Sequence, residues 1–135
     1  KILAKLPLKH KPGERWTYGL NTDVLGYLVE TWSGMPFDQF LKKRIFDPLG
    51  MNDTWFYLPK EKYNRLVPVY SGENGKTKKV TGMVFDNVNI DYPKTEGNYF
   101  SGGAGLSSTV EDYAKFLQLF LNNGQYNGVR LLSRK

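Results

Sequence analysis

The sequence contains no cysteine and only one histidine among its 135 residues. The absence of cysteine excludes a disulfide framework and thiol chemistry, and it is compatible with any compartment. His10 lies among lysines, as surface histidines commonly do, and no cluster of metal-ligating residue types surrounds it. We therefore expect neither a metal site nor a cofactor. Apolar runs are short, so no segment has the length needed to span a membrane.

The charge balance is basic, with a formal net charge of +6, and the excess lies mainly in residues 1–15 and 60–79. A basic surface can attract nucleic acid or another polyanion. Here the lysines and arginines are not interleaved with aromatic residues as in RNA-binding motifs, so we interpret them as solvated surface and expect no nucleic-acid partner. A basic interaction domain for acidic partners is the alternative, and salt-sensitive binding to polyanions would support it.

The length is that of one domain and allows a core to be buried. The chain begins at Lys1 instead of Met and stops at Lys135 in the middle of a pattern. We interpret residues 1–135 as a single domain that is a fragment of a longer protein. A periplasmic or secreted parent protein is compatible with this interpretation, but the sequence determines neither compartment nor oligomeric state.

Three stretches carry apolar residues at helical spacing, and we expect helices near residues 22–33, 36–46 and 109–122. Asn21 or Thr22 can cap the first helix, and Gly34 can end it in the left-handed conformation. Pro36 suits the first turn of the second helix, and Pro48 is expected to stop it. These helices, with few strands, indicate an α+β fold that is mainly α.

The remaining stretches favour turns and short strands. Asn74-Gly75 is a two-residue turn signal, so we expect a small β-hairpin near residues 67–80. Residues 82–99 show little periodicity and are expected to form an irregular connection over the helices. Residues 108–111 form a capping box that predicts the start of the third helix.

The chain is organised around residues 12–26, PGERWTYGLNTDVLG, in which a Pro-Gly turn and a short extended piece lead into the first helix. Tyr18 lies just before that helix, where its hydroxyl can point out of the core into a cleft. A phenol has a pKa of about 10, so it acts as a base near neutral pH only beside a cation that lowers this value. From this residue alone, an aromatic side chain that pins a loop and a general base both remain open.

Three stretches in order resemble the serine β-lactamase, penicillin-binding protein and esterase superfamily, in particular its class C-like branch. The first is Tyr18-Gly19-Leu20 after the Pro-Gly turn, and the second is IFDPLGMNDTWF at residues 45–56, which we expect to serve packing. The third covers residues 101–133, with a Gly-Gly-Xaa-Gly-Leu-Xaa-Ser-Thr loop, an Asp-Xaa-Ala helix and a Gly-Val-Xaa-Leu-Leu-Ser ending.

The resemblance implies the helical subdomain of a β-lactamase/transpeptidase-like fold, with a small β-hairpin. It implies that Tyr18 is a general base or proton shuttle beside a serine nucleophile and a lysine. It also places the glycine loop near the substrate cleft, with four candidate substrate-binding residues: Ser101, Gly102, Gly103 and Ala104. A loop shaped only for packing is the equal alternative. The implied substrate is a small ester, an amide or a peptidoglycan-type compound, and Leu20, where class C β-lactamases usually have Asn, favours the esterase-like members.

Two of the family's motifs are missing from this sequence. No serine is followed three positions later by a lysine, so the Ser-Xaa-Xaa-Lys nucleophile motif is absent, and so is the Lys-Thr-Gly or His-Xaa-Gly strand. We therefore expect the chain by itself to be inactive, and the intact parent protein to be a serine hydrolase of the esterase, D-Ala peptidase or β-lactamase type. The alternative is a non-catalytic module of the same fold that binds peptidoglycan or another ligand.

Overall fold

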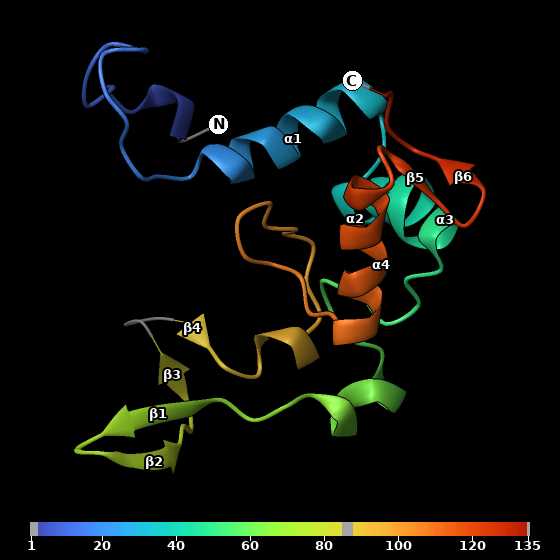
Figure 1. Cartoon of the computed structure of the whole chain (residues 1–135). Coiled ribbons are helices and arrows are strands. Elements are labelled where there is room, and N and C mark those ends of the chain that lie inside the picture. Colours follow the sequence, from blue (N-terminus) through green and yellow to red (C-terminus); the bar gives the residue numbers. More distant parts are fainter. Residues whose placement is uncertain (1–2, 85–87, 135) are drawn as a thin grey trace.

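The computed structural model describes residues 3–84 and 88–134, and its longer helices lie at one end of the molecule (Figure 1). The helices are α1 (Asn21–Ser33), α2 (Phe37–Leu41), α3 (Asp47–Leu49) and α4 (Val110–Leu121), with 3-10 turns at Leu3–Lys5, Lys60–Arg65 and Tyr92–Lys94. The strands are β1 (Tyr70–Glu73), β2 (Lys76–Lys79), β3 (Met83–Val84), β4 (Val88–Asn89), β5 (Gln125–Tyr126) and β6 (Val129–Arg130). In the described residues they pair as three antiparallel two-stranded sheets, so the expected α+β, mainly α fold is confirmed.

Helix α1 has the expected extent, but the expected side-chain cap is wrong. Leu20 occupies the capping position and makes no side-chain capping hydrogen bond, and Asn21 is already inside the helix. Asp23 lies in the first turn, where a negative charge is favoured by the helix dipole. Gly34 ends the helix at a φ of 67°, as expected, and its N–H donates to the carbonyl of Glu30 at 3.0 Å.

Helix α2 starts at Phe37, one residue after the expected Pro36. Pro36 takes the capping position, and the carboxylate of Glu30 on α1 accepts a hydrogen bond from the Phe37 N–H at 2.9 Å. A side chain of the preceding helix therefore satisfies a free N–H at the start of α2.

The expected stop at Pro48 is wrong. A π-helical turn at Lys42–Phe46 follows α2 and leads directly into α3, in whose first turn Pro48 lies. Phe46, just before α3, is itself helical at φ −68° and ψ −50°, so the helical path continues through the proline directly after the π-helical turn. Gly50 ends the segment instead, at a φ of 66°.

The core lies where the turns of α2 and α3 meet α4. Its buried apolar residues are Phe46, Leu49, Met51 and Leu119, with Leu41, Ile45, Phe116, Tyr126 and Leu131 packed against them. Three of the four come from residues 45–56, so the packing role expected for that stretch is confirmed. The buried Asp112 of α4 ties this region together, because its Oδ2 accepts hydrogen bonds from the Asp53 N–H at 2.7 Å and the Thr54 hydroxyl at 3.0 Å.

Helix α4 starts with a threonine cap, one residue later than the capping box predicted. The Thr109 hydroxyl accepts the Asp112 N–H at 3.2 Å, whereas the Ser108 hydroxyl bonds Thr54 at 2.8 Å. The expected register is wrong because Ser108 is engaged by a segment that is distant in the sequence.

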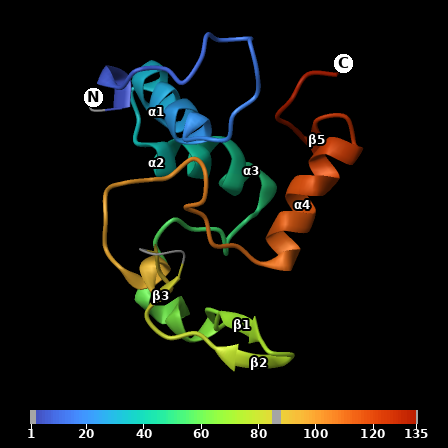
Figure 2. The ribbon, with the colours of Figure 1, turned by 90° about the vertical axis from the view of Figure 1, so that its left-hand side faces the viewer.

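The hairpin expected near residues 67–80 is confirmed as β1–β2. Asn74 and Gly75 form its turn at φ values of 51° and 72°, and Figures 1 and 2 show the hairpin projecting away from the helices. Residues 93 and 94 do not lie over the longer helices as expected, because the Leu58 N–H donates to the Pro93 carbonyl at 2.6 Å and the Tyr63 hydroxyl donates to the Lys94 carbonyl at 2.6 Å. At the end of this stretch the expected contact with a helix is present, since the Tyr99 hydroxyl donates to Asp23 of α1 at 2.9 Å. The part of this expectation that concerns residues 85–87 falls outside the described residues.

Candidate active site

Tyr18 lies on the surface three residues before α1. Its side chain is 85% exposed, and its ring meets the edge of Trp16, itself 82% exposed, at a centroid distance of 6.3 Å. Within residues 3–84 and 88–134 nothing forms a hydrogen bond with the Tyr18 hydroxyl. The phenol is therefore available to groups that approach the start of α1 from outside.

Ser101 gives the glycine loop its shape. Its hydroxyl donates to Oδ1 of Asp23 at 2.6 Å and accepts the N–H groups of Gly103 at 3.3 Å and Ala104 at 3.2 Å. The loop also closes on itself, since the Gly105 N–H donates to the Ser101 carbonyl at 3.2 Å. The Ser101 hydroxyl is thus occupied within the loop and by α1.

The same carboxylate oxygen of Asp23 also accepts the Tyr99 hydroxyl at 2.9 Å. The hydrogen bond from Ser101 is the largest cause that lowers the pKa of Asp23 below its usual value of 3.8, while partial burial opposes it. The bond to Asp23 raises the pKa of Tyr99. Because the pKa of Asp23 is lowered on folding, this contact stabilises the fold above about pH 4 and is lost as the pH falls through the lowered pKa.

Two glycines let the loop lie directly against the first turn of α1. A Cβ at Gly102 would collide with the carbonyl oxygen of Thr22, and one at Gly103 would lie 2.9 Å from Oδ2 of Asp23. Neither residue has a positive φ, so the backbone conformation does not require glycine here. Glycine is required because the loop backbone lies so close to the first turn of α1. The loop therefore packs against the same end of α1 that Tyr18 precedes.

The far end of the loop is fixed to the segment that follows α3. Trp55 and Ser107 form an antiparallel bridge, with N–H···O distances of 2.9 and 2.8 Å. A Cβ at Gly105 would lie 2.7 Å from the ring of Phe56, and that ring meets Phe100 at a centroid distance of 5.3 Å. Aromatic packing on one side and Asp23 on the other hold the loop.

The two predicted site segments are thus joined by Asp23, which sequence reasoning did not include in the site. Its position in a helical first turn is visible in the sequence, but its partners lie 76 and 78 residues away. The sequence carries no signal that pairs them. The described residues contain no group of three His, Cys, Asp or Glu side chains placed to hold a metal ion.

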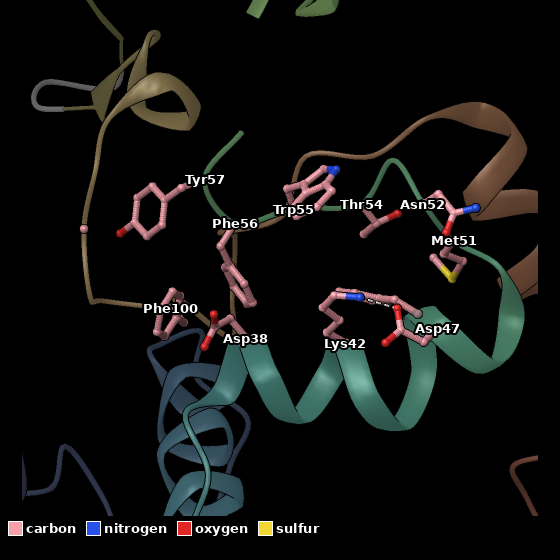
Figure 3. Close-up of a pocket in the computed structure, with 12 residues that line it drawn as sticks. Asp38, Lys42, Asp47, Met51, Asn52, Thr54, Trp55, Phe56, Tyr57 and Phe100 are labelled. Carbon is pink, nitrogen blue, oxygen red and sulfur yellow. Dashed lines mark hydrogen bonds and ion pairs between the residues drawn. The ribbon is translucent and has the colours of Figure 1, made fainter. Parts of the chain in front are cut away.

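A separate cavity of about 360 Å³ lies between α2 and residues 51–57 (Figure 3). The Asp38 carboxylate lies beside Phe56 and Phe100, and Lys42 pairs with Asp47 further along the helix. One oxygen of Asp38 is buried without a hydrogen-bond partner in the described part of the chain. Neither Tyr18 nor any residue of the range 101–104 lines this cavity.

A model of the family described as Beta-lactamase matches residues 1–134. The chain belongs to the Beta-lactamase family. The resemblance found in the sequence motifs is thereby confirmed, and the fold is that of the β-lactamase-like serine hydrolases. No helix in the described part of the chain is long and apolar enough to cross a membrane.

Two curated relatives and one solved structure illustrate the similarity. "Protein Rv1367c" of Mycobacterium tuberculosis is 35% identical over 97% of this chain and 31% of its own length. The "Putative D-alanyl-D-alanine carboxypeptidase" of Salmonella typhi is 28% identical over 100% of this chain and 33% of its own length. The structure of "EstCE1, a hydrolase with promiscuous acyltransferase activity" shares the fold, with a TM-score of 0.81 and 24% identity over 96% of this chain and 36% of that chain.

The chain therefore spans about a third of the length of the curated relatives that it matches.

Proposed function

We propose that residues 1–135 are the tyrosine-bearing part of a serine hydrolase that acts on a small ester, an amide or a peptidoglycan-type substrate. Tyr18 takes the proton of the nucleophilic serine, and Ser101, Gly102, Gly103 and Ala104 form the loop beside the substrate. The observation that supports this most is the exposed phenol of Tyr18, at the same end of α1 to which Asp23 attaches the glycine loop. The relatives named as a hydrolase and a carboxypeptidase agree with this chemistry.

The proposed reaction is acyl transfer to a serine supplied by a Ser-Xaa-Xaa-Lys motif that this sequence does not contain. The serine oxygen bonds to the substrate carbonyl carbon while its proton passes to the Tyr18 oxygen. That proton then goes to the leaving group, and water releases the acyl group in a second step. Tyr18 must be a phenolate to accept this proton, and the ammonium group of the motif's lysine favours that charged form.

In the proposed reaction the glycine loop borders the substrate and does not supply the oxyanion site. The N–H groups of Gly103 and Ala104 donate to the Ser101 hydroxyl, so in this arrangement they are not free to stabilise a substrate oxyanion. The oxyanion site is accordingly assigned to groups outside the loop. The substrate contacts of residues 101–104 are steric and polar contacts along the edge of the cleft.

We further propose that the chain is one piece of a larger catalytic domain. Its accessible surface is 11004 Å², whereas a compact monomer of 15.5 kDa exposes about 7,200 Å². Several large apolar side chains contribute to the excess, among them Trp16, Trp32, Val110 and Leu121. A surface of this kind is typical of a unit that is covered by further parts of its domain.

The test is Tyr18→Phe in the full-length protein, assayed with a chromogenic nitrophenyl ester. This change keeps the ring and removes only the hydroxyl. If Tyr18 is the base, kcat falls by about a hundred- to ten-thousand-fold while the melting temperature hardly moves.

Tyr27→Phe is the matched control, because the side chain of Tyr27 is exposed like that of Tyr18 but lies within α1. It should retain full turnover. If Tyr18→Phe also retains full turnover, the proposal for Tyr18 is wrong, whereas a full-length wild type that hydrolyses no ester would favour the non-catalytic binding module.

A further inference from the structure

We infer that Asp23 is the positioning residue that holds the glycine loop in its substrate-binding shape, an inference that rests on the function proposed above for that loop. Asp23 does not touch the reacting atoms. It acts through Ser101 and Tyr99, whose hydroxyl groups both donate to its Oδ1 atom.

The hydrogen bonds form a relay from α1 into the loop backbone. Asp23 accepts a hydrogen bond from the Ser101 hydroxyl, which orients the oxygen lone pairs of Ser101 toward the N–H groups of Gly103 and Ala104. Because its acceptor is a carboxylate, the bond from Ser101 to Asp23 is charge-assisted, and bonds of this class are shorter and stronger than neutral ones. The distance of 2.6 Å between Ser101 Oγ and Asp23 Oδ1 agrees with this class.

Steric contacts make the loop depend on the position of this carboxylate. Gly103 lies so close to Oδ2 of Asp23, and Gly102 so close to the carbonyl of Thr22, that neither position has room for a methyl group. The first turn of α1 therefore sets how near the loop backbone comes, and the hydrogen bonds to Asp23 hold the loop against that limit. Removal of the carboxylate takes away the attraction and leaves an open space where Oδ2 was.

Loss of the Asp23 carboxylate should weaken substrate binding and leave the chemical step nearly unchanged. Tyr18 precedes α1 and forms no hydrogen bond with Asp23 in the described part of the chain, so loss of the carboxylate leaves the proposed base in place. The loop that borders the substrate loses its shape. We expect KM to rise by about tenfold or more, the effect of losing hydrogen bonds to a charged group, while kcat changes by less than about threefold.

The experiment compares Asp23→Ala, Asp23→Asn and Ser101→Ala in the full-length protein, with the same nitrophenyl ester over a range of concentrations. Asp23→Asn keeps an oxygen acceptor and loses the charge, so its KM should lie between those of the wild type and Asp23→Ala. Asp91→Ala is the control, since it removes an exposed aspartate that pairs with Lys94 and has no hydrogen bond to residues 101–104 in the described part of the chain. It should leave both constants unchanged.

Amide hydrogen exchange at Gly103 and Ala104 is measured on the same proteins. It should accelerate by about tenfold or more in both variants, because Ser101→Ala removes the acceptor of these N–H groups and Asp23→Ala removes the carboxylate that holds this acceptor in place. Unchanged exchange together with unchanged KM in Asp23→Ala would overturn the inference. If Asp23→Ala does not fold, the same two readouts in Asp23→Asn decide.

The two proposals fail in different ways. If Tyr18→Phe abolishes turnover and the Asp23 variants keep the wild-type KM, only the role of Asp23 is wrong. If Tyr18→Phe keeps full turnover while the Asp23 variants raise KM, only the role of Tyr18 is wrong. If the full-length wild type hydrolyses no ester, the proposed function fails, and unchanged exchange at Gly103 and Ala104 still overturns the anchoring role of Asp23.

Discussion

Two aspartates, each in the first turn of a helix, connect parts of this chain that are distant in sequence. Asp23 of α1 accepts hydrogen bonds from Tyr99 and Ser101, and Asp112 of α4 accepts them from Asp53 and Thr54. The sequence predicts the place of Asp23 from the preference for negative charge at a helix start. It could not predict the partners of either residue, because those depend on the path of loops that have no periodic pattern.

Asp112→Ala should lower the free energy of unfolding by about 2–4 kcal/mol, because it leaves the Asp53 N–H without its acceptor and removes a buried partner of Thr54. Its other oxygen is paired with Lys115 at 2.9 Å, and that pair is lost as well. Urea denaturation of the full-length protein measures the difference. Glu111→Gln, at the exposed neighbouring position, is the control and should change stability by less than about 0.5 kcal/mol. Equal stability of the two variants would show that the contact between Asp112 of α4 and residues 53–54 does not stabilise the fold.

At the scale of elements, periodicity predicted α1, the α2 region and α4, and the Asn-Gly turn predicted β1–β2. Boundaries were less accurate, for identifiable reasons. Glu30 of α1 caps α2, and Ser108 is drawn to Thr54, so the caps depend on tertiary contacts. The π-helical turn at Lys42–Phe46 lets the chain pass Pro48, and no pattern in the sequence indicates such a turn.

The start of α4 offers a test of its capping register. Thr109→Ala should lower the free energy of unfolding by about 1 kcal/mol, since it removes the acceptor of the Asp112 N–H. If the capping box predicted from the sequence were correct, Ser108 would cap the helix and Glu111→Ala, which removes the side-chain acceptor of the box, would also be destabilising. Urea denaturation of Thr109→Ala and Glu111→Ala separates the two registers, and a larger loss in Glu111→Ala would contradict the structure.

At the scale of the whole molecule, the sequence motifs were sufficient to identify the family, and the match over residues 1–134 agrees with them. The motifs could not show which apolar side chains remain exposed on the surface of the chain. Tyr18 and Trp16 form an exposed aromatic pair, and α4 exposes Val110 and Leu121 on its outer side. The absence of a nucleic-acid partner stays a prediction.

Residues 1–135 expressed alone should be less stable than the full-length protein and should bind the dye ANS, because their exposed apolar side chains lack the rest of the proposed domain. They should also hydrolyse no activated ester, since they carry no Ser-Xaa-Xaa-Lys motif. Thermal unfolding, dye fluorescence and an ester assay on both proteins provide the comparison. A cooperative transition at the full-length temperature without dye binding would show that the chain is a complete folding unit.

The reaction of the nucleophilic serine with a fluorophosphonate, which forms an O–P bond and releases fluoride, tests most directly whether Tyr18 takes the serine proton. The full-length protein and its Tyr18→Phe variant are incubated with a fluorophosphonate, and the adduct is followed by mass spectrometry over time. We predict a single adduct on the serine of a Ser-Xaa-Xaa-Lys motif outside residues 1–135, formed about a hundred- to ten-thousand-fold more slowly in the variant. Equal rates in the two proteins, or an adduct on a serine of this chain such as Ser101, would contradict the account.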